Sequence, residues 1–265
     1  MMMKRFLYFL RTCVLVATIV LFATSCRKES EKDEFSANLV VELREAFVKG
    51  QRHAGLYVAT LEEYPCSNFE ISYHYTHAGG VRMIVFEGIP KQEECLAEFG
   101  PARAFIDMGV MGEGAHAVTL EIGENSLNTR FQVEDEYLMV DVLNKGAATT
   151  LEFQEKTMHR LPQNHVWGYV HPKVPGDDTH YPVFLQKLAE AGAKEKHLQP
   201  GNYGFFRVAQ DGLYLYDHVY QYMPGRPLVM TFEGEFQMLQ DIAMNFRDHC
   251  VIALYSAKGH VFHNQ

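Results

Sequence analysis

Apolar and polar residues alternate along much of the first half of the chain. Every second position from Phe69 to Tyr75 is apolar, and Gly79-Gly80 then leads into the apolar-rich run 81–88. Alternation of this kind is typical of strands with one buried face, and a diglycine between two such runs predicts a β-hairpin. Four further short runs follow, at 102–110, 116–122, 128–133 and 137–142. Their spacing of roughly 8–12 residues favours a β-sandwich or meander.

The segment ahead of these runs has the spacing of a helix instead. Its apolar residues recur three or four positions apart, at Leu39, Val40, Leu43 and Phe47. Ser36 is a suitable N-cap and Gly50 a suitable C-terminal stop. We therefore predict an amphipathic helix over residues 36–50.

After Leu161-Pro162 strand and helix patterns alternate. Strands are predicted at 167–170, 204–208, 213–217 and 250–256, with an Asp211-Gly212 turn between the middle two. One helical face consists of Tyr181, Phe184, Leu185, Leu188 and Gly192, preceded by Thr179 as N-cap. A second consists of Phe236, Leu239, Ala243 and Phe246. The order β-α-β-β-α-β is compatible with a ferredoxin-like α+β domain.

The chain as a whole is therefore expected to be an α+β protein in four segments. They are a signal peptide (1–25), a charged tether (26–35), a β-sandwich-like antiparallel domain that begins with the helix (36–156), and a ferredoxin-like domain (162–265).

The first segment has the three parts of an export signal. Met1 to Arg11 contains three basic residues and no acid, and Cys13 to Phe22 is apolar except for Thr18. This run is much shorter than the roughly 20 residues that span a bilayer, so it predicts a cleaved signal peptide.

The segment ends in Ala23-Thr24-Ser25-Cys26, which resembles the lipobox of bacterial lipoproteins in its Bacteroidota form. The resemblance covers residues 1–26, and Ala23 stands where the commonest lipobox has Leu. It implies cleavage before Cys26, lipidation of that cysteine with diacylglycerol and a further acyl chain, and residence in the outer membrane. Several acyl chains give a lasting anchor.

A charged tether follows the lipidated position. Seven of the eight residues 27–34 are charged, a composition that stays solvated. It resembles surface-export signals of that phylum, although Arg27 and Lys28 precede the acids, so display on the cell surface and on the periplasmic face both remain open. Removing residues 1–25 takes away three positive charges, and the net charge changes from −9 to −12.

Composition and motifs exclude several functions. The acidic balance argues against nucleic acid as a partner. The sequence contains no G-x-S-x-G, H-E-x-x-H, P-loop or C-x-x-C motif, so we assign no catalytic residue, metal ligand or cofactor. Two pairs of histidines, His74/His77 and His260/His263, have the spacing i and i+3. On a strand the two members of such a pair point to opposite faces, so neither pair is expected to chelate a metal ion. The 171–180 loop contains four side chains whose nitrogen or oxygen atoms could bind a metal ion, and we expect them to be solvated loop residues instead. They are His171, Asp177, Asp178 and His180.

The cysteines and acids leave two further possibilities open. With Cys13 removed and Cys26 lipidated, Cys66 and Cys95 are the pair available for a disulfide, while Cys250 leads an apolar strand and is expected to be buried.

A hydrolase of surface polysaccharide or peptide would need two facing carboxylates. Its candidates are Asp107, Glu121, Asp217 and Glu233.

Aromatic residues are dense between positions 203 and 222. Tyrosines at alternate positions form two pairs, Tyr214 with Tyr216 and Tyr220 with Tyr222, near Asp217 and Gln221. They predict either a shelf that stacks on sugar rings or part of the second core.

We accordingly expect a lipid-anchored binding or assembly module whose partner is a glycan, a peptide or an envelope protein. A hydrolase is the alternative.

Overall fold

The computed structural model describes residues 37–66, 68–90, 97–144, 150–210, 212–215 and 225–264, with the backbone alone at 97 and 212–215. These residues are mostly β-sheet, and they contain two short helices, α2 (His180–Glu190) and α3 (Phe236–Met244). The expected β-rich α+β class is therefore confirmed. Within the described ranges, no helix has the length and apolar character needed to cross a membrane.

The segment predicted as the first helix is a strand, β1 (Leu39–Val48). It pairs along its whole length with β2 (Gln51–Cys66), and its first residues pair with β9. Lys49 and Gly50 have φ angles of 52° and 77°, which suit a two-residue hairpin turn. Gly50 therefore turns a hairpin and does not end a helix. The helix prediction is wrong because Leu39, Val41 and Leu43 also fit a period of two, and the neighbouring strand β2 and the distant strand β9 supply the hydrogen bonds.

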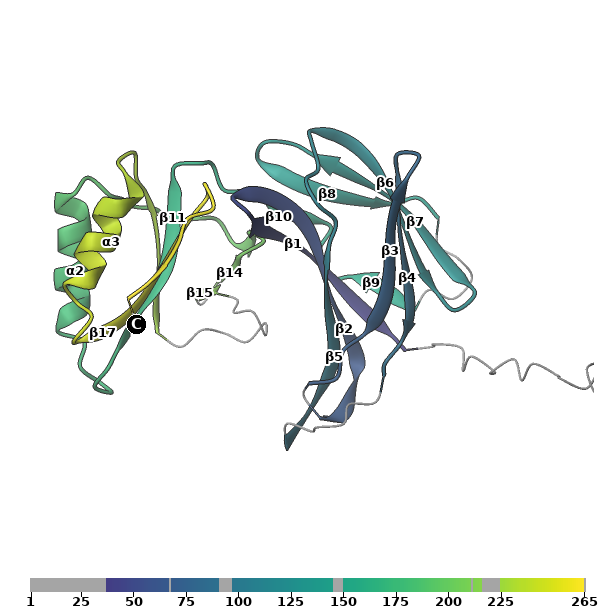
Figure 1. Cartoon of the computed structure of the whole chain (residues 1–265), viewed down its shortest axis with the longest axis horizontal. Coiled ribbons are helices and arrows are strands. Elements are labelled where there is room, and N and C mark those ends of the chain that lie inside the picture. The colour runs from purple at the N-terminus through teal and green to yellow at the C-terminus, as the bar shows by residue number, and fades with distance from the viewer. Residues whose placement is uncertain are drawn as a thin grey trace, which may run out of the picture. The chain divides into compact units, whose positions relative to one another are not determined.

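The strands β1 to β10 form two facing sheets, which we call the sandwich part (Figure 1). The four-stranded sheet has the order β5 (Ala97–Asp107), β2, β1 and β9 (Leu151–Phe153). The six-stranded sheet has the order β10 (Thr157–His159), β8 (Tyr137–Val142), β7 (Asn125–Val133), β6 (Gly114–Ile122), β4 (Val81–Gly88) and β3 (Ser72–Ala78). The predicted hairpin at Gly79-Gly80 joins β3 and β4.

The sandwich part differs from the prediction in strand direction. The pairs β1–β9 and β4–β6 are parallel, so the sheets are mixed and not purely antiparallel. The chain leaves the six-stranded sheet after β4, runs through β5 in the other sheet and returns as β6, which gives β4 and β6 one direction. Between the sheets, the Phe131 and Phe153 rings meet edge-on at 6.2 Å between centroids.

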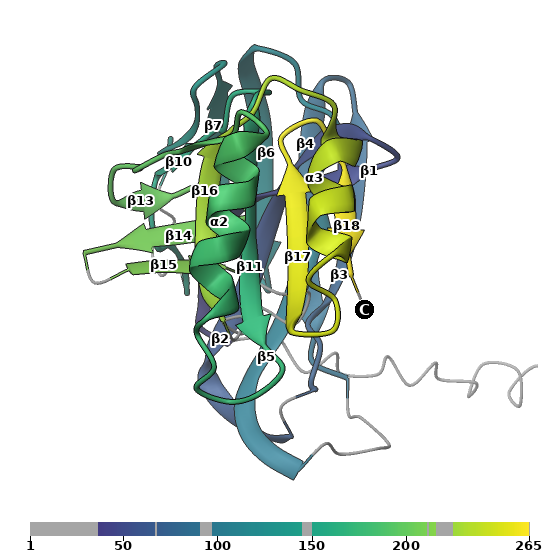
Figure 2. The same ribbon diagram turned by 90° about the vertical axis from the view of Figure 1, so that its left-hand side faces the viewer.

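The remaining elements form what we call the helical part. Its main sheet is antiparallel, with the order β12 (Lys194–Glu195), β16 (Arg226–Thr231), β11 (His165–Pro172), β17 (Cys250–Ser256) and β18 (Val261–His263). Helices α2 and α3 lie side by side on one face of this sheet (Figure 2). Thr179 precedes α2 as predicted, but its hydroxyl donates to Asp177 and does not cap the helix.

Both faces of the main sheet are buried. Val166 and Val170 of β11 face the helices, whereas Trp167 and Tyr169 face a second apolar cluster with Phe206. This second cluster is covered by a small sheet of β13 (Gly201–Asn202), β14 (Phe206–Ala209) and β15 (Gly212–Leu215). Burial on both faces explains why β11 and β17 read as continuous apolar runs.

Candidate functional site

The predicted tyrosine shelf lies mainly outside the described residues. Tyr214 belongs to strand β15, of which the backbone is described. The other five members are outside the described ranges: Tyr216, Asp217, Tyr220, Gln221 and Tyr222. The shelf therefore stays a prediction from the sequence.

The aromatic residues just before this segment serve the core. Phe206 is fully buried, and the Tyr203 ring stacks on it at 5.3 Å between centroids. The Tyr203 hydroxyl donates to the Gln199 carbonyl. Phe205 lies between Trp167 of the main sheet and Phe47 of the sandwich part. These rings pack against other parts of the chain.

The histidines and acids of the 171–180 loop do not gather into a metal site. Asp178 forms an ion pair with Arg226, and the His180 ring stacks on His249 at 3.9 Å between centroids. Among the residues that the structure describes, no group of three or more His, Cys, Asp or Glu side chains is placed to hold a metal ion.

The four acids considered for a hydrolase are not brought together where the structure describes them. Asp107 ends β5 and lies 2.9 Å from His53 Nδ1, whereas Glu121 is on β6 in the other sheet. Glu233 follows β16 in the helical part and accepts a hydrogen bond from the Asn164 amide. Asp217 lies outside the described residues.

The cysteines have two different environments. Cys66 is disulfide-bonded, and Cys250 is a buried free thiol whose pKa burial raises. Cys66 pairs with Ala97 across β2 and β5. Cys95 is outside the described residues, so the bond from Cys66 to Cys95 stays a prediction.

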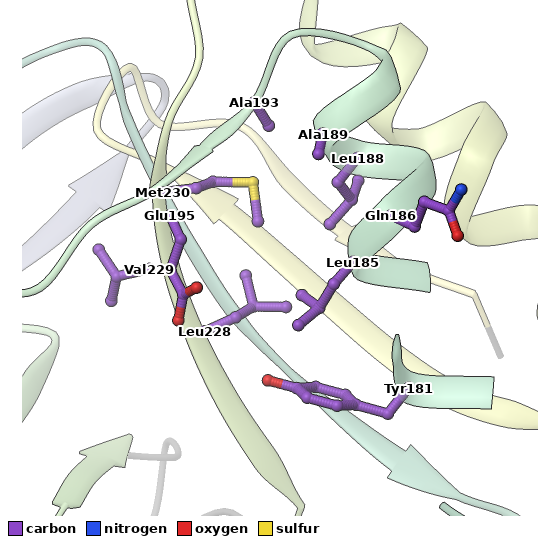
Figure 3. Close-up of a pocket in the computed structure, with 10 residues that line it drawn as sticks. All are labelled: Tyr181, Leu185, Gln186, Leu188, Ala189, Ala193, Glu195, Leu228, Val229 and Met230. Atoms are coloured by element: carbon purple, nitrogen blue, oxygen red, sulfur yellow. The ribbon is translucent and has the colours of Figure 1, made fainter. Parts of the chain in front are cut away.

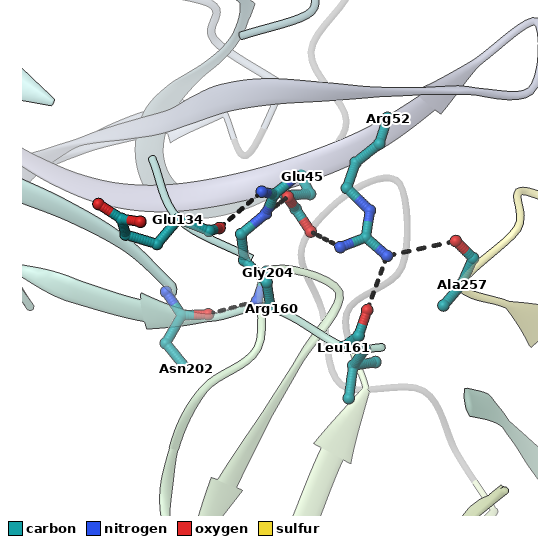
Figure 4. A network of polar contacts seen from close by, with 8 residues as sticks. All are labelled: Glu45, Arg52, Glu134, Arg160, Leu161, Asn202, Gly204 and Ala257. Carbon is teal, nitrogen blue, oxygen red and sulfur yellow. Dashed lines mark hydrogen bonds and ion pairs between the residues drawn. The ribbon is translucent and has the colours of Figure 1, made fainter. Parts of the chain in front are cut away.

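A buried ion network joins the sandwich part to the helical part (Figure 4). Glu45 of β1 is 6% exposed and accepts a hydrogen bond of 2.8 Å from Arg160 Nε. Arg52 Nη1 lies 3.5 Å from the other Glu45 oxygen, and its Nη2 donates to the carbonyls of Leu161 and Ala257. Burial raises the pKa of Glu45 against the opposing attraction of both guanidiniums. The network thus fixes the β1–β2 hairpin against the turn after β17.

A hollow of about 690 Å³ lies over this network. It is lined by acidic and basic side chains, among them Asp135, Glu136 and Lys258. Its two arginines, Arg52 and Arg160, already bind Glu45 and three backbone carbonyls. Because these donors are engaged, the hollow is best understood as part of the junction.

A second hollow has an apolar floor and a few polar groups at its margin. We call it the α2–β16 groove; its volume is about 290 Å³, and it lies between helix α2 and strands β12 and β16 (Figure 3). Helix α2 contributes Tyr181, Leu185, Gln186, Leu188 and Ala189. The strands and the turn before β12 contribute Ala193, Glu195, Leu228, Val229 and Met230.

The polar groups of the groove are at its margin. The Glu195 carboxylate is exposed, and the half-buried Tyr181 ring crosses one end of the groove with its hydroxyl directed towards the strands (Figure 3). Within the described ranges neither group has a side-chain hydrogen bond or an ion-pair partner. The pKa of Tyr181 is raised by burial and by the nearby Glu195 charge, against the opposing effect of the Arg226 charge.

Sequence reasoning found half of this groove. The predicted helical face already contained Tyr181, Leu185 and Leu188, but nothing in the sequence singled out Glu195. Glu195 reaches the groove because Lys194 and Glu195 pair with Thr231 and Met230. A two-residue strand leaves no periodic signal that a single sequence would reveal.

Comparison with known proteins adds no assignment. The chain matches no protein-family model, no curated protein and no solved structure.

Proposed function

We propose that this chain is a lipid-anchored envelope protein that binds a ligand in the α2–β16 groove. The anchoring part rests on the residues before Cys26, and an outer-membrane location follows from the lipobox resemblance. The binding part rests on one observation: an apolar groove with the Tyr181 hydroxyl and the Glu195 carboxylate at its margin. Such a combination is characteristic of ligand sites, whose few polar groups fix orientation.

The chemistry of the groove favours binding over hydrolysis. Its polar side chains are a phenol, a carboxylate and the amide of Gln186, and its other lining side chains are apolar. A hydrolase of the two-carboxylate kind would need a second carboxylate that faces Glu195 across the groove. The residues that line the groove include no second carboxylate.

We also propose that the helical part is a ferredoxin-like unit. Its two β-α-β passages are β11–α2–β12 and β16–α3–β17, and the sheet order β12-β16-β11-β17 places the first and third of these strands in the centre. The small β13–β15 sheet is then an insertion between β12 and β16, and β18 is an added edge strand. This order and the placement of both helices on one face support the proposal.

Metabolic labelling tests the anchor. Intact cells grown with a palmitate analogue should incorporate it into the wild-type chain and not into Cys26→Ser, because that cysteine carries the acyl chains. An unlabelled wild-type chain, or a mature N-terminus other than Cys26, would remove the argument for anchoring.

A fragment screen tests the groove. A soluble chain beginning at Phe35 is screened by ligand-observed NMR against a library of small molecules. Ala189→Trp fills the groove from the exposed side of α2, so the hits should be lost in this variant. Val183→Trp is the matched control, since Val183 is exposed on the same helix and does not line the groove. Hits that bind equally to all three chains would contradict the proposed site.

A further inference from the structure

We infer that the α2–β16 groove takes an apolar chain that carries a positively charged group, an ammonium or a guanidinium. The inference rests on the proposed function and adds the chemical class of the ligand. It follows from three features of the groove: its floor, the charge at its margin, and the pairing of the neighbouring charges.

The floor of the groove is suited to an aliphatic body. Leu185 and Leu188 of α2 face Leu228 and Met230 of β16, and the small side chains of Ala189 and Ala193 lie at the end of the groove away from Tyr181 (Figure 3). Leu188, Leu228 and Met230 belong to the helical part's core and are held by it. Transfer of methylene groups from water to this surface is favourable.

The one charged side chain among the residues that line the groove is Glu195, and its charge is negative. Arg226 lies over the Tyr181 ring, 5.0 Å from its centroid, and forms an ion pair with Asp178. Lys187 of α2 forms an ion pair with Glu190. Each of these two pairs has no net charge.

Lys194 and Lys196 flank Glu195 in the sequence, and successive residues of a strand point to opposite faces. Neither lysine lines the groove. A cation in the groove would therefore meet the Glu195 carboxylate directly and could also donate to the Tyr181 phenol oxygen.

Two sources supply this chemistry. One is a lysine or arginine side chain flanked by apolar residues in a peptide, and the other is a free amphiphilic amine. Both place a cation at the end of an aliphatic chain, so the groove chemistry is the same.

Matched probes test the charge preference. Octylamine, octanol and octanoate share one apolar body and differ in the charge of the head group. Their binding to the soluble chain beginning at Phe35 is measured by calorimetry and by chemical-shift changes at Leu185 and Leu228. We expect octylamine to bind about threefold more tightly than octanol, and octanoate to bind most weakly.

Substitutions locate the origin of the preference. Glu195→Gln should reduce octylamine affinity to that of octanol and leave octanol binding unchanged. Glu113→Gln, an exposed acid on the sandwich part, should change neither. Circular dichroism confirms that both variants are folded.

A peptide separates the two sources. Acetyl-Leu-Lys-Leu-amide is compared with the same peptide in which norleucine replaces the lysine. Tighter binding of the lysine peptide supports a peptide as the ligand. Binding of octylamine without tighter binding of the lysine peptide supports a free amine. Equal binding of octylamine, octanol and octanoate overturns the inference while the groove remains a binding site. The loss of fragment hits in Ala189→Trp tests the site itself, so the two failures are distinguishable.

Discussion

At the scale of single residues, the buried Glu45 carboxylate is the group on which the junction depends most. Replacing it with Ala would leave the Arg52 and Arg160 guanidiniums without their counter-charge in a buried setting. Breaking a buried ion pair in this way costs about 3–5 kcal/mol. We therefore expect Glu45→Ala to lower the free energy of unfolding by that amount in a urea titration at neutral pH.

An exposed ion pair provides the control for this prediction. Arg130 and Asp141 lie 2.7 Å apart on the surface of the sandwich part, with side chains about half exposed. Exposed pairs contribute about 0–1 kcal/mol, so Asp141→Ala should have a small effect. Comparable losses in the two variants would show that burial of Glu45 is unimportant.

His165, at the start of β11, should make stability depend on pH. Burial and the nearby Lys196 lower its pKa below the ordinary 6.5, and its Nδ1–H donates to the Asn164 amide oxygen at 3.0 Å. The unfolded chain then binds a proton near pH 6.5 that the folded chain rejects. Stability is present in full above that pH and decreases as the pH falls through it.

The comparison with His165→Gln isolates this effect. Thermal melts of the wild type and of the variant are recorded from pH 8 to pH 5. Glutamine does not titrate, so the melting temperature of the wild type should fall more steeply below about pH 6.5. Parallel profiles for the two chains would mean that His165 has the same pKa in both states.

At the scale of elements, Gly168 sets how closely two central strands approach. It lies in the middle of β11 opposite Leu254, and a Cβ atom built there would be 2.0 Å from the Ala253 carbonyl oxygen. Because the obstacle is backbone, Gly168→Ala must separate β11 from β17. Overpacking of this kind costs about 1–3 kcal/mol or more, measurable as a lower urea midpoint.

Gly112→Ala is the matched control for Gly168→Ala. A Cβ atom at Gly112 meets nothing within 4 Å, and its φ angle is outside the left-handed region. The control should therefore unfold like the wild type. If Gly168→Ala also unfolded like the wild type, the close strand contact would be wrong.

The elements also show what a single sequence can predict. Strands β4, β8 and β17 lie at the predicted positions 81–88, 137–142 and 250–256, because their periodicity and turn residues agree. Strand β1 was mispredicted because its apolar residues fit two periods. Its partner β9 is more than a hundred residues away, and local spacing carries no information on such pairing.

The same reasoning applies to the candidate site. The helical face of α2 was predictable from its period, so Tyr181, Leu185 and Leu188 were already placed on one side of a helix. The position of strand β16 beneath that face was not predictable, since it depends on the order of the strands in the sheet. Glu195 shares the groove with Tyr181 only because the chain returns beside β16.

At the scale of the whole molecule, the junction should make the two parts unfold together. Besides the Glu45 network, the Asn202 amide of the helical part donates to the Leu43 carbonyl of β1, and Phe47 stacks on Phe205 at 5.1 Å between centroids. These contacts join the edge of one core to the other. Separating the parts would expose the buried Glu45 charge and both rings to water.

The single tryptophan makes cooperative unfolding testable. Trp167 is 3% exposed in the helical part, so its fluorescence follows that part, whereas far-UV circular dichroism follows the strands of both. We expect one urea transition at the same midpoint by both methods in the wild type. Glu45→Ala weakens the junction and should separate the two midpoints. Different midpoints in the wild type would show that the two parts unfold independently and that the buried network does not couple them.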